Sequence, residues 1–250
     1  MKSWGDVGFE IEITQDQSPT LRLLEPNYPD ALHGESMHHS GGAWAETNLI
    51  YGQPIREVIA KVKNPSFLIV GLGLGYIEMV IAKEALLAGR TPEDVPHMTS
   101  YESVPELREF FWKWVHGKDE ELAEEVSSIY HQVCKHVLLG TTLSAEDVRQ
   151  FLKFHFKSLE DIDEALLEPP DLKHKYHCIL YDAFSSKTTP YLWSEEFLSE
   201  ILKQGAAESC AFSTYACRVS LKQALANHGF EVIVRPGFKG KRNSTLGLRS

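Results

Sequence analysis

The chain has 250 residues, of which 43% are hydrophobic and 24% are charged, and this composition excludes a disordered or low-complexity protein. Its 25 Lys and Arg against 35 Asp and Glu give a formal net charge of -10, which taken alone argues against nucleic acid as a partner. No apolar run approaches the roughly 18 to 20 residues of a membrane span, and the first residues lack the apolar core of a signal peptide. We therefore expect a cytoplasmic protein without a membrane partner.

The N-terminal part predicts a hairpin. Apolar and polar residues alternate over residues 7–24 on either side of a Gln-Asp-Gln-Ser-Pro turn. A polar, glycine-containing stretch follows over residues 33–42. We expect residues 1–52 to form a hairpin-and-loop extension of a main domain over residues 53–250.

The pattern then changes to alternating strands and helices. Phe67–Val70 is a continuous apolar run that predicts a strand covered on both faces, and a glycine loop at Gly71–Gly75 and a helix from Ile77 follow it. The alternation predicts a mostly parallel sheet with helices on both faces. Further strands are expected at residues 98–102, 176–182, 209–215, 230–235 and 244–248, and further helices at residues 105–115, 194–203 and 217–228.

Residues 118–165 do not follow this alternation. An acidic run over 119–125 and apolar residues at helical spacing predict a helical insertion at about residues 116–148, with the acidic run on a solvated face. The apolar stretch over residues 151–156 could form a further strand. The four scattered cysteines predict reduced, buried thiols, and no residue spacing predicts a metal site.

The glycine loop indicates a ligand site. Glycines between a buried strand and a helix let the backbone turn sharply and let a ligand approach the positive end of the helix dipole. The dinucleotide fingerprint has its third glycine where this chain has Tyr76, so the spacing is GxGxG rather than GxGxxG. GxGxG after the first parallel strand is typical of class I, Rossmann-like methyltransferases. A turn that only permits close packing of strand and helix is the alternative.

Two carboxylates stand where strands are expected to end. Glu102 ends the second parallel strand, where a carboxylate can accept both hydroxyls of an adenosine ribose. Asp182 ends a later strand, at the carboxyl edge where open α/β sheets bind their ligands. The alternative for Glu102 is a strand-end carboxylate without a ligand.

Several sequence blocks resemble the MnmC-like family, the methyltransferase domain that completes 5-methylaminomethyl modification of uridine at the tRNA wobble position. The segment D-A-F-S-S-K-T-T-P-Y-L-W over 182–193 is similar to the family's D-x-F-x-P-x-x-N-P-x-L-W. The other matching blocks are residues 42–47, 71–75, 213–230 and 235–242. The resemblance implies an α/β fold of the class I S-adenosylmethionine-dependent methyltransferases, with a mostly parallel seven-stranded sheet.

The resemblance also implies an activity and a set of site residues. The expected reaction converts 5-aminomethyl-(2-thio)uridine to 5-methylaminomethyl-(2-thio)uridine in the tRNA anticodon loop, with S-adenosyl-L-methionine as cofactor. Asp182 would orient the acceptor amine or take its proton, because the amine must be neutral when it attacks. The implied cofactor residues are Glu46, Gly71, Gly73, Gly75, Glu102, Leu159, Glu160 and Asp182. The implied substrate residues are Phe184, Trp193, Tyr215, Arg218, Lys239, Lys241 and Arg242.

The chain departs from the family pattern mainly in the substrate blocks. Ser186 and Thr189 replace the family's Pro and Asn, and Asn243 replaces a Glu. A relative with a changed nucleic acid or amine substrate, or a catalytically inactive binding module, therefore remains an alternative. Further alternatives are a dinucleotide-dependent oxidoreductase acting on CH–NH groups, which Tyr76 disfavours, and an aminopropyl transferase, which the absence of a GGGDG-type loop disfavours.

The charge is unevenly distributed along the chain. Residues 232–250 contain no acid and five basic residues, namely Arg235, Lys239, Lys241, Arg242 and Arg249. The acidic excess lies in the rest of the chain. We therefore expect a small, localised tRNA contact beside the cofactor pocket rather than broad adhesion to nucleic acid. No stable protein partner can be inferred.

Overall fold

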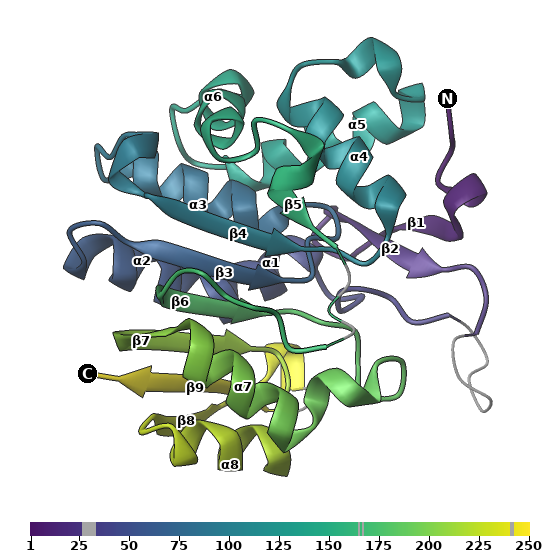
Figure 1. Ribbon diagram of the computed structural model, residues 1–250. Coiled ribbons are helices and arrows are strands. Elements are labelled where there is room, and N and C mark those ends of the chain that lie inside the picture. Colours follow the sequence, from purple (N-terminus) through teal and green to yellow (C-terminus); the bar gives the residue numbers. More distant parts are fainter. Residues whose placement is uncertain (27–33, 165, 167, 241–242) are drawn as a thin grey trace.

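The computed structural model describes residues 1–26, 34–164, 166, 168–240 and 243–250. A seven-stranded sheet forms the centre, helices cover both of its faces, and a two-stranded hairpin lies beside the carboxyl ends of the parallel strands (Figure 1). No described helix is long and apolar enough to cross a membrane.

The sheet has the strand order β5-β4-β3-β6-β7-β9-β8. Neighbours from β5 to β7 are parallel, whereas β9 is antiparallel to both β7 and β8. The mostly parallel seven-stranded sheet expected from the sequence is confirmed. The strands are β3 (Ser66–Val70), β4 (His97–Tyr101), β5 (Ile162–Asp163), β6 (Tyr176–Tyr181), β7 (Ala206–Thr214), β8 (Glu231–Arg235) and β9 (Ser244–Arg249).

Two apolar cores lie on opposite faces of the sheet. Phe67 and Ile69 of β3 belong to the first core, and Leu68 and Val70 belong to the second, so the continuous apolar run covers both faces. Helices α2 to α6 contribute to the first core, and α7 and α8 to the second. The helices are α1 (Ala43–Thr47), α2 (Gln53–Lys61), α3 (Tyr76–Leu87), α4 (Pro105–Val115), α5 (Glu124–Val137), α6 (Ala145–His155), α7 (Glu195–Gly205) and α8 (Val219–Asn227).

The segment between β4 and β5 is helical. It forms α4, α5 and α6; α5 and α6 pack against α3, and α4 packs against α5 and α6 (Figure 1). The possible strand at residues 151–156 is wrong, because these residues lie in α6 or at its end. Ser144 and Asp147 form a capping box at the start of this helix, and Val148, Phe151 and Leu152 are buried at helical spacing.

The N-terminal extension packs against the helical segment. It contains the hairpin of β1 (Phe9–Ile13) and β2 (Pro19–Leu23), as the sequence predicts. Trp4 packs edge-on against Phe110 of α4 with 5.5 Å between ring centroids, and its backbone N–H donates to Glu125 of α5. The chain then reaches α1 and a π-helical turn over Asn48–Gly52 before α2.

The topology reverses direction at the centre of the sheet. The chain extends from β3 through β4 to β5 on one side, and from β6 to β7 on the other. The loops that follow β3 and β6 therefore diverge. In open α/β sheets the crevice at such a switch point is where ligands bind.

Candidate functional site

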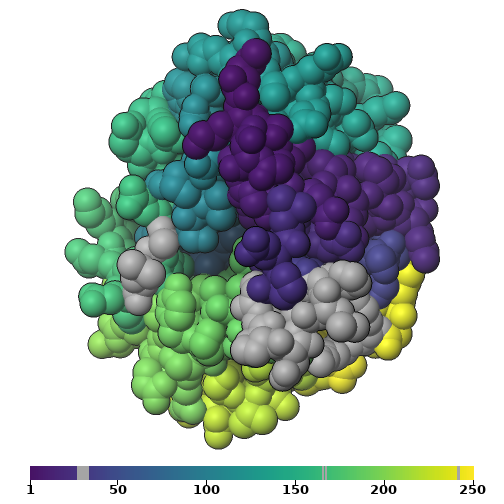
Figure 2. Space-filling model, turned by 90° about the vertical axis from the view of Figure 1, so that its right-hand side faces the viewer, coloured from purple at the N-terminus to yellow at the C-terminus, as the bar shows by residue number. Residues whose placement is uncertain are grey.

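A cavity of about 500 Å³ opens at this switch point. One side is formed by the ends of β3, β4 and β6, and the opposite side by the part of the extension between Glu35 and Tyr51. Figure 2 shows the hollow between the N-terminal segment, the helices after β4 and the loop after β6. Its volume lies within the roughly 300–1,000 Å³ typical of ligand and cofactor sites.

The glycine loop borders the cavity directly after β3. Gly71, Gly73 and Gly75 have φ angles of +97°, +52° and +74°, which side chains disfavour. A Cβ at Gly71 would overlap the backbone carbonyl of Asp182, and one at Gly75 would overlap the Phe111 ring. Gly73 lines the cavity, so a side chain there would occupy space open to a ligand. Glycine at positions 71 and 75 permits close packing against Asp182 and Phe111, and glycine at position 73 keeps the cavity wall free of a further side chain.

Glu102 joins the glycine loop to the start of α4. Its Oε2 accepts the backbone N–H of Gly73 at 2.9 Å, and its Oε1 accepts that of Val104 at 2.9 Å. The side chain lines the cavity, and burial raises its pKa while these two hydrogen bonds lower it. Because a carboxylate offers about four lone-pair sites, Glu102 can still accept hydrogen bonds from a ligand.

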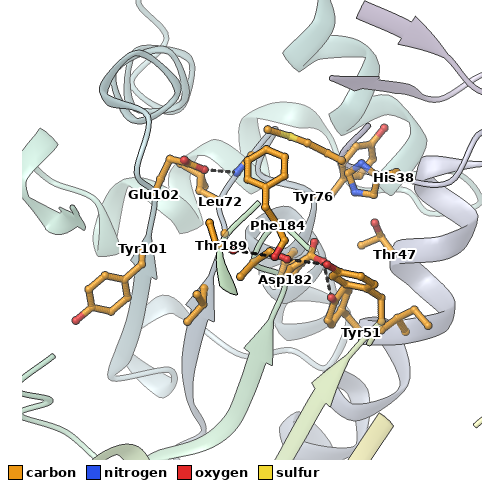
Figure 3. Close-up of a pocket in the computed structure, with 18 of the residues that line it drawn as sticks. His38, Thr47, Tyr51, Leu72, Tyr76, Tyr101, Glu102, Asp182, Phe184 and Thr189 are labelled. Carbon is orange, nitrogen blue, oxygen red and sulfur yellow. Dashed lines mark hydrogen bonds between the residues drawn. The ribbon is translucent and has the colours of Figure 1, made fainter. Parts of the chain in front are cut away.

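Asp182 follows β6 and lies deep in the cavity (Figure 3). Burial raises its pKa to about 7, a hydrogen bond from Tyr51 lowers it, and the negative charge of Glu46 raises it. The Tyr51 hydroxyl donates to Oδ1 of Asp182 at 2.6 Å. A carboxyl group whose pKa lies near neutrality is suited to accept a proton at physiological pH.

Tyr76 occupies the position of the third glycine in a dinucleotide fingerprint. Its ring is buried, its hydroxyl donates to the Pro19 carbonyl at 2.8 Å, and His38 packs edge-on against it. The side chain connects the start of α3 to the hairpin and forms part of the cavity wall. In the dinucleotide fingerprint the third glycine permits close packing of the helix against the strand, and here that position carries a full aromatic ring.

The structure brings about half of the predicted site residues to the cavity. Those that line it are Glu46, Gly71, Gly73, Glu102, Asp182, Phe184 and Tyr215. They come from five separate parts of the chain, and Gly75 supports the loop from behind.

Trp193 lies behind the cavity wall. Its side chain is 3% exposed, and its Nε1 donates to the backbone carbonyl of Phe184 at 2.8 Å. Tyr191, which precedes it by two residues in the 3-10 turn Pro190–Trp193, lines the cavity and is 41% exposed. Trp193 therefore supports Phe184, and of the two aromatic side chains in this turn Tyr191 is the one that lines the cavity.

Leu159 and Glu160 lie away from the cavity. They form a 3-10 turn before β5, at the amino end of that strand. Because β5 is parallel to β4, its carboxyl end meets the cavity, and there Glu164 and Leu166 form part of the lining.

The loop after Asp182 is held from two sides. The guanidinium of Arg218 donates to the hydroxyl of Ser186. On the other side, Glu35 accepts the backbone N–H and the hydroxyl of Ser185, each at 3.0 Å, and the hydroxyl of Thr188. Arg218 does not line the cavity, whereas Glu35 does.

The predicted basic patch is only partly available to a partner. Arg235, Lys239 and Arg249 each donate to backbone carbonyls within the protein. Lys241 and Arg242 lie outside the described residues. Internal hydrogen bonds thus engage three of the five cations expected to contact RNA.

Sequence reasoning missed Tyr51, Glu35 and Tyr191. Tyr51 and Glu35 belong to the extension, and no local pattern relates them to Asp182, which lies more than a hundred residues away. Tyr191 belongs to the segment over residues 182–193 that resembles the family pattern. Its exposure follows from the turn geometry, which a residue pattern does not specify.

A family model described as S-adenosyl-L-methionine-dependent methyltransferase matches residues 120–250 of this chain. Two curated relatives named tRNA 5-methylaminomethyl-2-thiouridine biosynthesis bifunctional protein MnmC come from Campylobacter hominis and Hahella chejuensis. They are 24% and 29% identical over 80% and 81% of this chain. The aligned parts are 28% and 32% of the relatives, so the chain spans about three tenths of their length.

Among solved structures, MnmC2 from Aquifex aeolicus matches with a TM-score of 0.60 and 24% identity. The match covers 96% of this chain and 70% of that chain. At this identity the likeness shows a shared fold.

Proposed function

The chain belongs to the S-adenosyl-L-methionine-dependent methyltransferase family, and on this premise we propose that it methylates the primary amine of 5-aminomethyl-(2-thio)uridine at the tRNA wobble position. The relatives' name describes synthesis of the corresponding methylated nucleoside. They are bifunctional proteins, and the proposal for this chain covers methyl transfer alone.

S-adenosyl-L-methionine is the cofactor of this family, and the cavity residues fit it. Gly73 adds no side chain of its own to the wall where we place the amino acid end of the cofactor, and the Met37 sulfur lies 3.2 Å from the position of a Cβ there. Glu102 offers carboxylate oxygens for the ribose hydroxyls. Glu164 and Leu166 line the part of the cavity beyond β4 and β5, where we place the adenine.

The charge of the cavity supports an amine acceptor. Among the described residues that line it there is no Lys or Arg, and the ionisable side chains include five carboxyl groups. They belong to Glu35, Glu46, Glu102, Glu164 and Asp182. Such a lining favours a cationic cofactor and an amine, and it disfavours a pyrophosphate.

The observation that carries the proposal is the half-buried Asp182 carboxyl group beside the glycine loop, with a pKa raised to about 7. When bound, S-adenosyl-L-methionine supplies an electrophilic methyl group: the amine lone pair forms the new N–C bond while the C–S electrons go to sulfur. Asp182 accepts a hydrogen bond from the amine and takes the proton that the nitrogen loses. The enclosing walls exclude water and fix the line of attack.

The acceptor is proposed to reach this carboxyl group as an unpaired base of the anticodon loop. Phe184 and Tyr191 border the cavity on the side of the loop after β6. Aromatic side chains hold unstacked RNA bases by stacking, at about 1–3 kcal/mol per base. A tRNA substrate implies that the protein works in the cytoplasm.

Two measurements test the proposal. Thermal melting with S-adenosyl-L-methionine, S-adenosylhomocysteine, NAD and FAD should show stabilisation by the first two only. Stabilisation by a dinucleotide alone would instead favour the oxidoreductase. Incubation with tRNA from cells that lack the methylated nucleoside, followed by nucleoside mass spectrometry, should show one added methyl group. Unchanged wobble nucleosides would remove tRNA from the proposal.

A further inference from the structure

A π-helical turn precedes α2 at the edge of the cavity. It spans Asn48–Gly52. Such turns are rare in proteins, and those that occur are often found at functional sites. The sequence explains the irregularity, because Pro54 has no backbone N–H to donate to the carbonyl of Ile50, its partner in a regular α-helix. The Ile50 carbonyl accepts hydrogen bonds from other elements instead.

Two side chains from the far end of the chain bind this carbonyl. The hydroxyl of Ser213 on β7 donates to it at 2.7 Å, and the guanidinium of Arg235 on β8 donates to it at 3.3 Å. The same guanidinium also donates to the Ser213 hydroxyl at 2.9 Å. The π-helical turn is thereby attached to two strands of the sheet.

The residue after Ile50 is the one that contacts Asp182. Tyr51 is 2% exposed, and its hydroxyl donates to Oδ1 of Asp182 at 2.6 Å, while the Tyr181 carbonyl lies 3.4 Å away (Figure 3). Among the described residues, the printed donor to this carboxylate is on Oδ1, which leaves Oδ2 for a ligand in the proposal below. One side of the carboxylate is occupied by a buried, fixed donor.

We propose that Tyr51 is a positioning residue for the Asp182 carboxylate, and that Ser213 and Arg235 hold Tyr51 in place through the carbonyl of Ile50. This role rests on the proposed function, since it assigns to Asp182 the contact with the acceptor amine. The hydroxyl of Tyr51 stabilises the ionised carboxylate and fixes its plane. Oδ2 then presents a lone pair in one direction.

Some of the groups around Asp182 raise its pKa and others lower it. The hydrogen bond from Tyr51 lowers its pKa, whereas burial and the charge of Glu46 on α1 raise it. Glu78 on α3 and Tyr215 after β7 also interact electrostatically with Asp182. Tyr51 is therefore the one neighbour among these described groups that favours the ionised form.

Arg235 supports this arrangement with a half-buried guanidinium group. Its Nε and Nη1 are buried without a hydrogen-bond partner among the described atoms. Burial lowers its pKa, while its interaction with Tyr51 raises it, so the cation lies within electrostatic reach of the tyrosine hydroxyl.

The test replaces Tyr51→Phe, which removes one hydroxyl and keeps the ring. The titration of Asp182 is followed by carbon-13 NMR of aspartate carboxyl groups in the cofactor-free protein, and the signal is assigned from its loss in Asp182→Asn. The midpoint should rise by about one pH unit above that of the unsubstituted protein, because a hydrogen bond to the charged form is lost. Tyr181→Phe, which removes a buried hydroxyl that donates to Leu192, is the matched control and should leave the midpoint unchanged.

Methyl transfer provides the second readout. In Tyr51→Phe, kcat for tRNA should fall several-fold at pH 7 and return towards normal at pH 9, with KM unchanged, because more Asp182 is protonated at neutral pH. Ser213→Ala should raise the Asp182 midpoint in the same direction by a smaller amount. An unchanged midpoint in Tyr51→Phe would overturn the proposal, and an unchanged midpoint in Ser213→Ala would overturn the part assigned to the Ile50 carbonyl.

These readouts separate the inference from the proposed function. If the unsubstituted protein binds the cofactor but methylates no tRNA, the proposed substrate fails, whereas the NMR titration still decides whether Tyr51 controls Asp182. If tRNA is methylated and Tyr51→Phe keeps the same pH profile and the same midpoint, only the inference fails.

Discussion

The two halves of the cavity are built in different ways. The half proposed to hold the cofactor uses the backbone of consecutive residues, Gly71–Gly75, and one carboxylate, Glu102, at the end of the adjacent strand. The half proposed to hold the acceptor uses side chains from the extension, the π-helical turn, and the ends of β6 and β7. A site formed by one local motif depends on backbone conformation, whereas a site assembled from distant segments depends on the contacts between those segments.

The largest effect expected from breaking the cofactor half is that of Gly71→Ala. Its Cβ would overlap the Asp182 carbonyl at a φ of +97°, and strain of this kind costs on the order of 1–3 kcal/mol before the clash is added. Thermal melting and calorimetric titration should show lower stability and little or no binding of S-adenosyl-L-methionine. Gly89→Ala, which has a φ of +69° and nothing within 4 Å of its Cβ, is the control for φ alone. Equal losses in the two variants would show that the contact with Asp182 is unimportant.

Asp182→Asn should break the acceptor half and spare the cofactor half. The amide cannot take a proton, so kcat should fall by about 10²–10⁴, the usual contribution of a general base. The dissociation constant of the cofactor, measured by calorimetry, should stay within a few-fold. Asp163→Asn, at the end of β5 and outside the cavity lining, is the matched carboxyl-to-amide control. A large loss of cofactor affinity in Asp182→Asn would contradict the division into halves.

Glu102→Gln should give the opposite pattern, with a smaller effect. The amide can no longer accept the N–H groups of both Gly73 and Val104, and its NH₂ group turns towards one of these donors. We expect the cofactor to bind about tenfold more weakly, a loss of about 1.4 kcal/mol, with kcat at saturation little changed. Glu106→Gln, on the surface of α4 beside Lys2, is the control. A fall in kcat alone would assign Glu102 to the acceptor half.

Glu35→Gln should affect only the acceptor. Glu35 accepts three hydrogen bonds from the loop after Asp182, and the amide weakens this charge-assisted set. KM for tRNA should rise about three- to tenfold, as expected for a loss of about 1 kcal/mol, while the cofactor dissociation constant stays constant. Steady-state kinetics at saturating cofactor measure this, and Glu10→Gln on the hairpin serves as control. An unchanged KM would mean that the extension does not set the position of this loop.

The smallest effect is a dependence of stability on pH. Burial raises the pKa of Asp182 to about 7 and that of Glu78 to about 8, both above their values in an unfolded chain. The folded state then binds more protons than the unfolded state between about pH 4 and 8, so stability falls as pH rises through this window. The cofactor-free protein should melt higher at pH 6 than at pH 8, by about 2–4 °C for each kcal/mol. Asp182→Asn should reduce this slope, and an unchanged slope would exclude Asp182 as its source.

The fold, and the place of the glycine loop and Glu102 at the cavity, could be predicted from the sequence, because strand pattern, glycine spacing and strand-end carboxylates are local signals. The contacts in the half proposed to hold the acceptor could not be predicted in this way. Trp193 and Tyr191 belong to the same turn, yet only Tyr191 reaches the cavity. The Tyr51 contact with Asp182 depends on how the extension packs against the sheet, and Pro54 indicates only that the helix is irregular there.

The α6 helix is a case in which the sequence pattern suggested the wrong secondary structure. Phe151, Leu152, Phe154 and Phe156 suit a strand by composition, but the capping box at Ser144 and the burial pattern favour a helix. Likewise, the basic residues near the C-terminus suggest a phosphate contact by sequence alone. In the structure Arg235 donates a hydrogen bond to the carbonyl of Ile50, which Pro54 cannot bind because it has no backbone N–H.

The contact between Gly71 and the Asp182 carbonyl has a consequence for substrate range. Because the main chain of Asp182 lies against Gly71, we expect substitutions of other cavity side chains to leave the separation between the glycine loop and Asp182, the proposed base, unchanged. Acceptors of another size must therefore be accommodated by other parts of the cavity wall, where Met37, Tyr191 and Phe238 present side chains. Selection for a new acceptor can thus act on those parts of the wall while the geometry of methyl delivery stays constant.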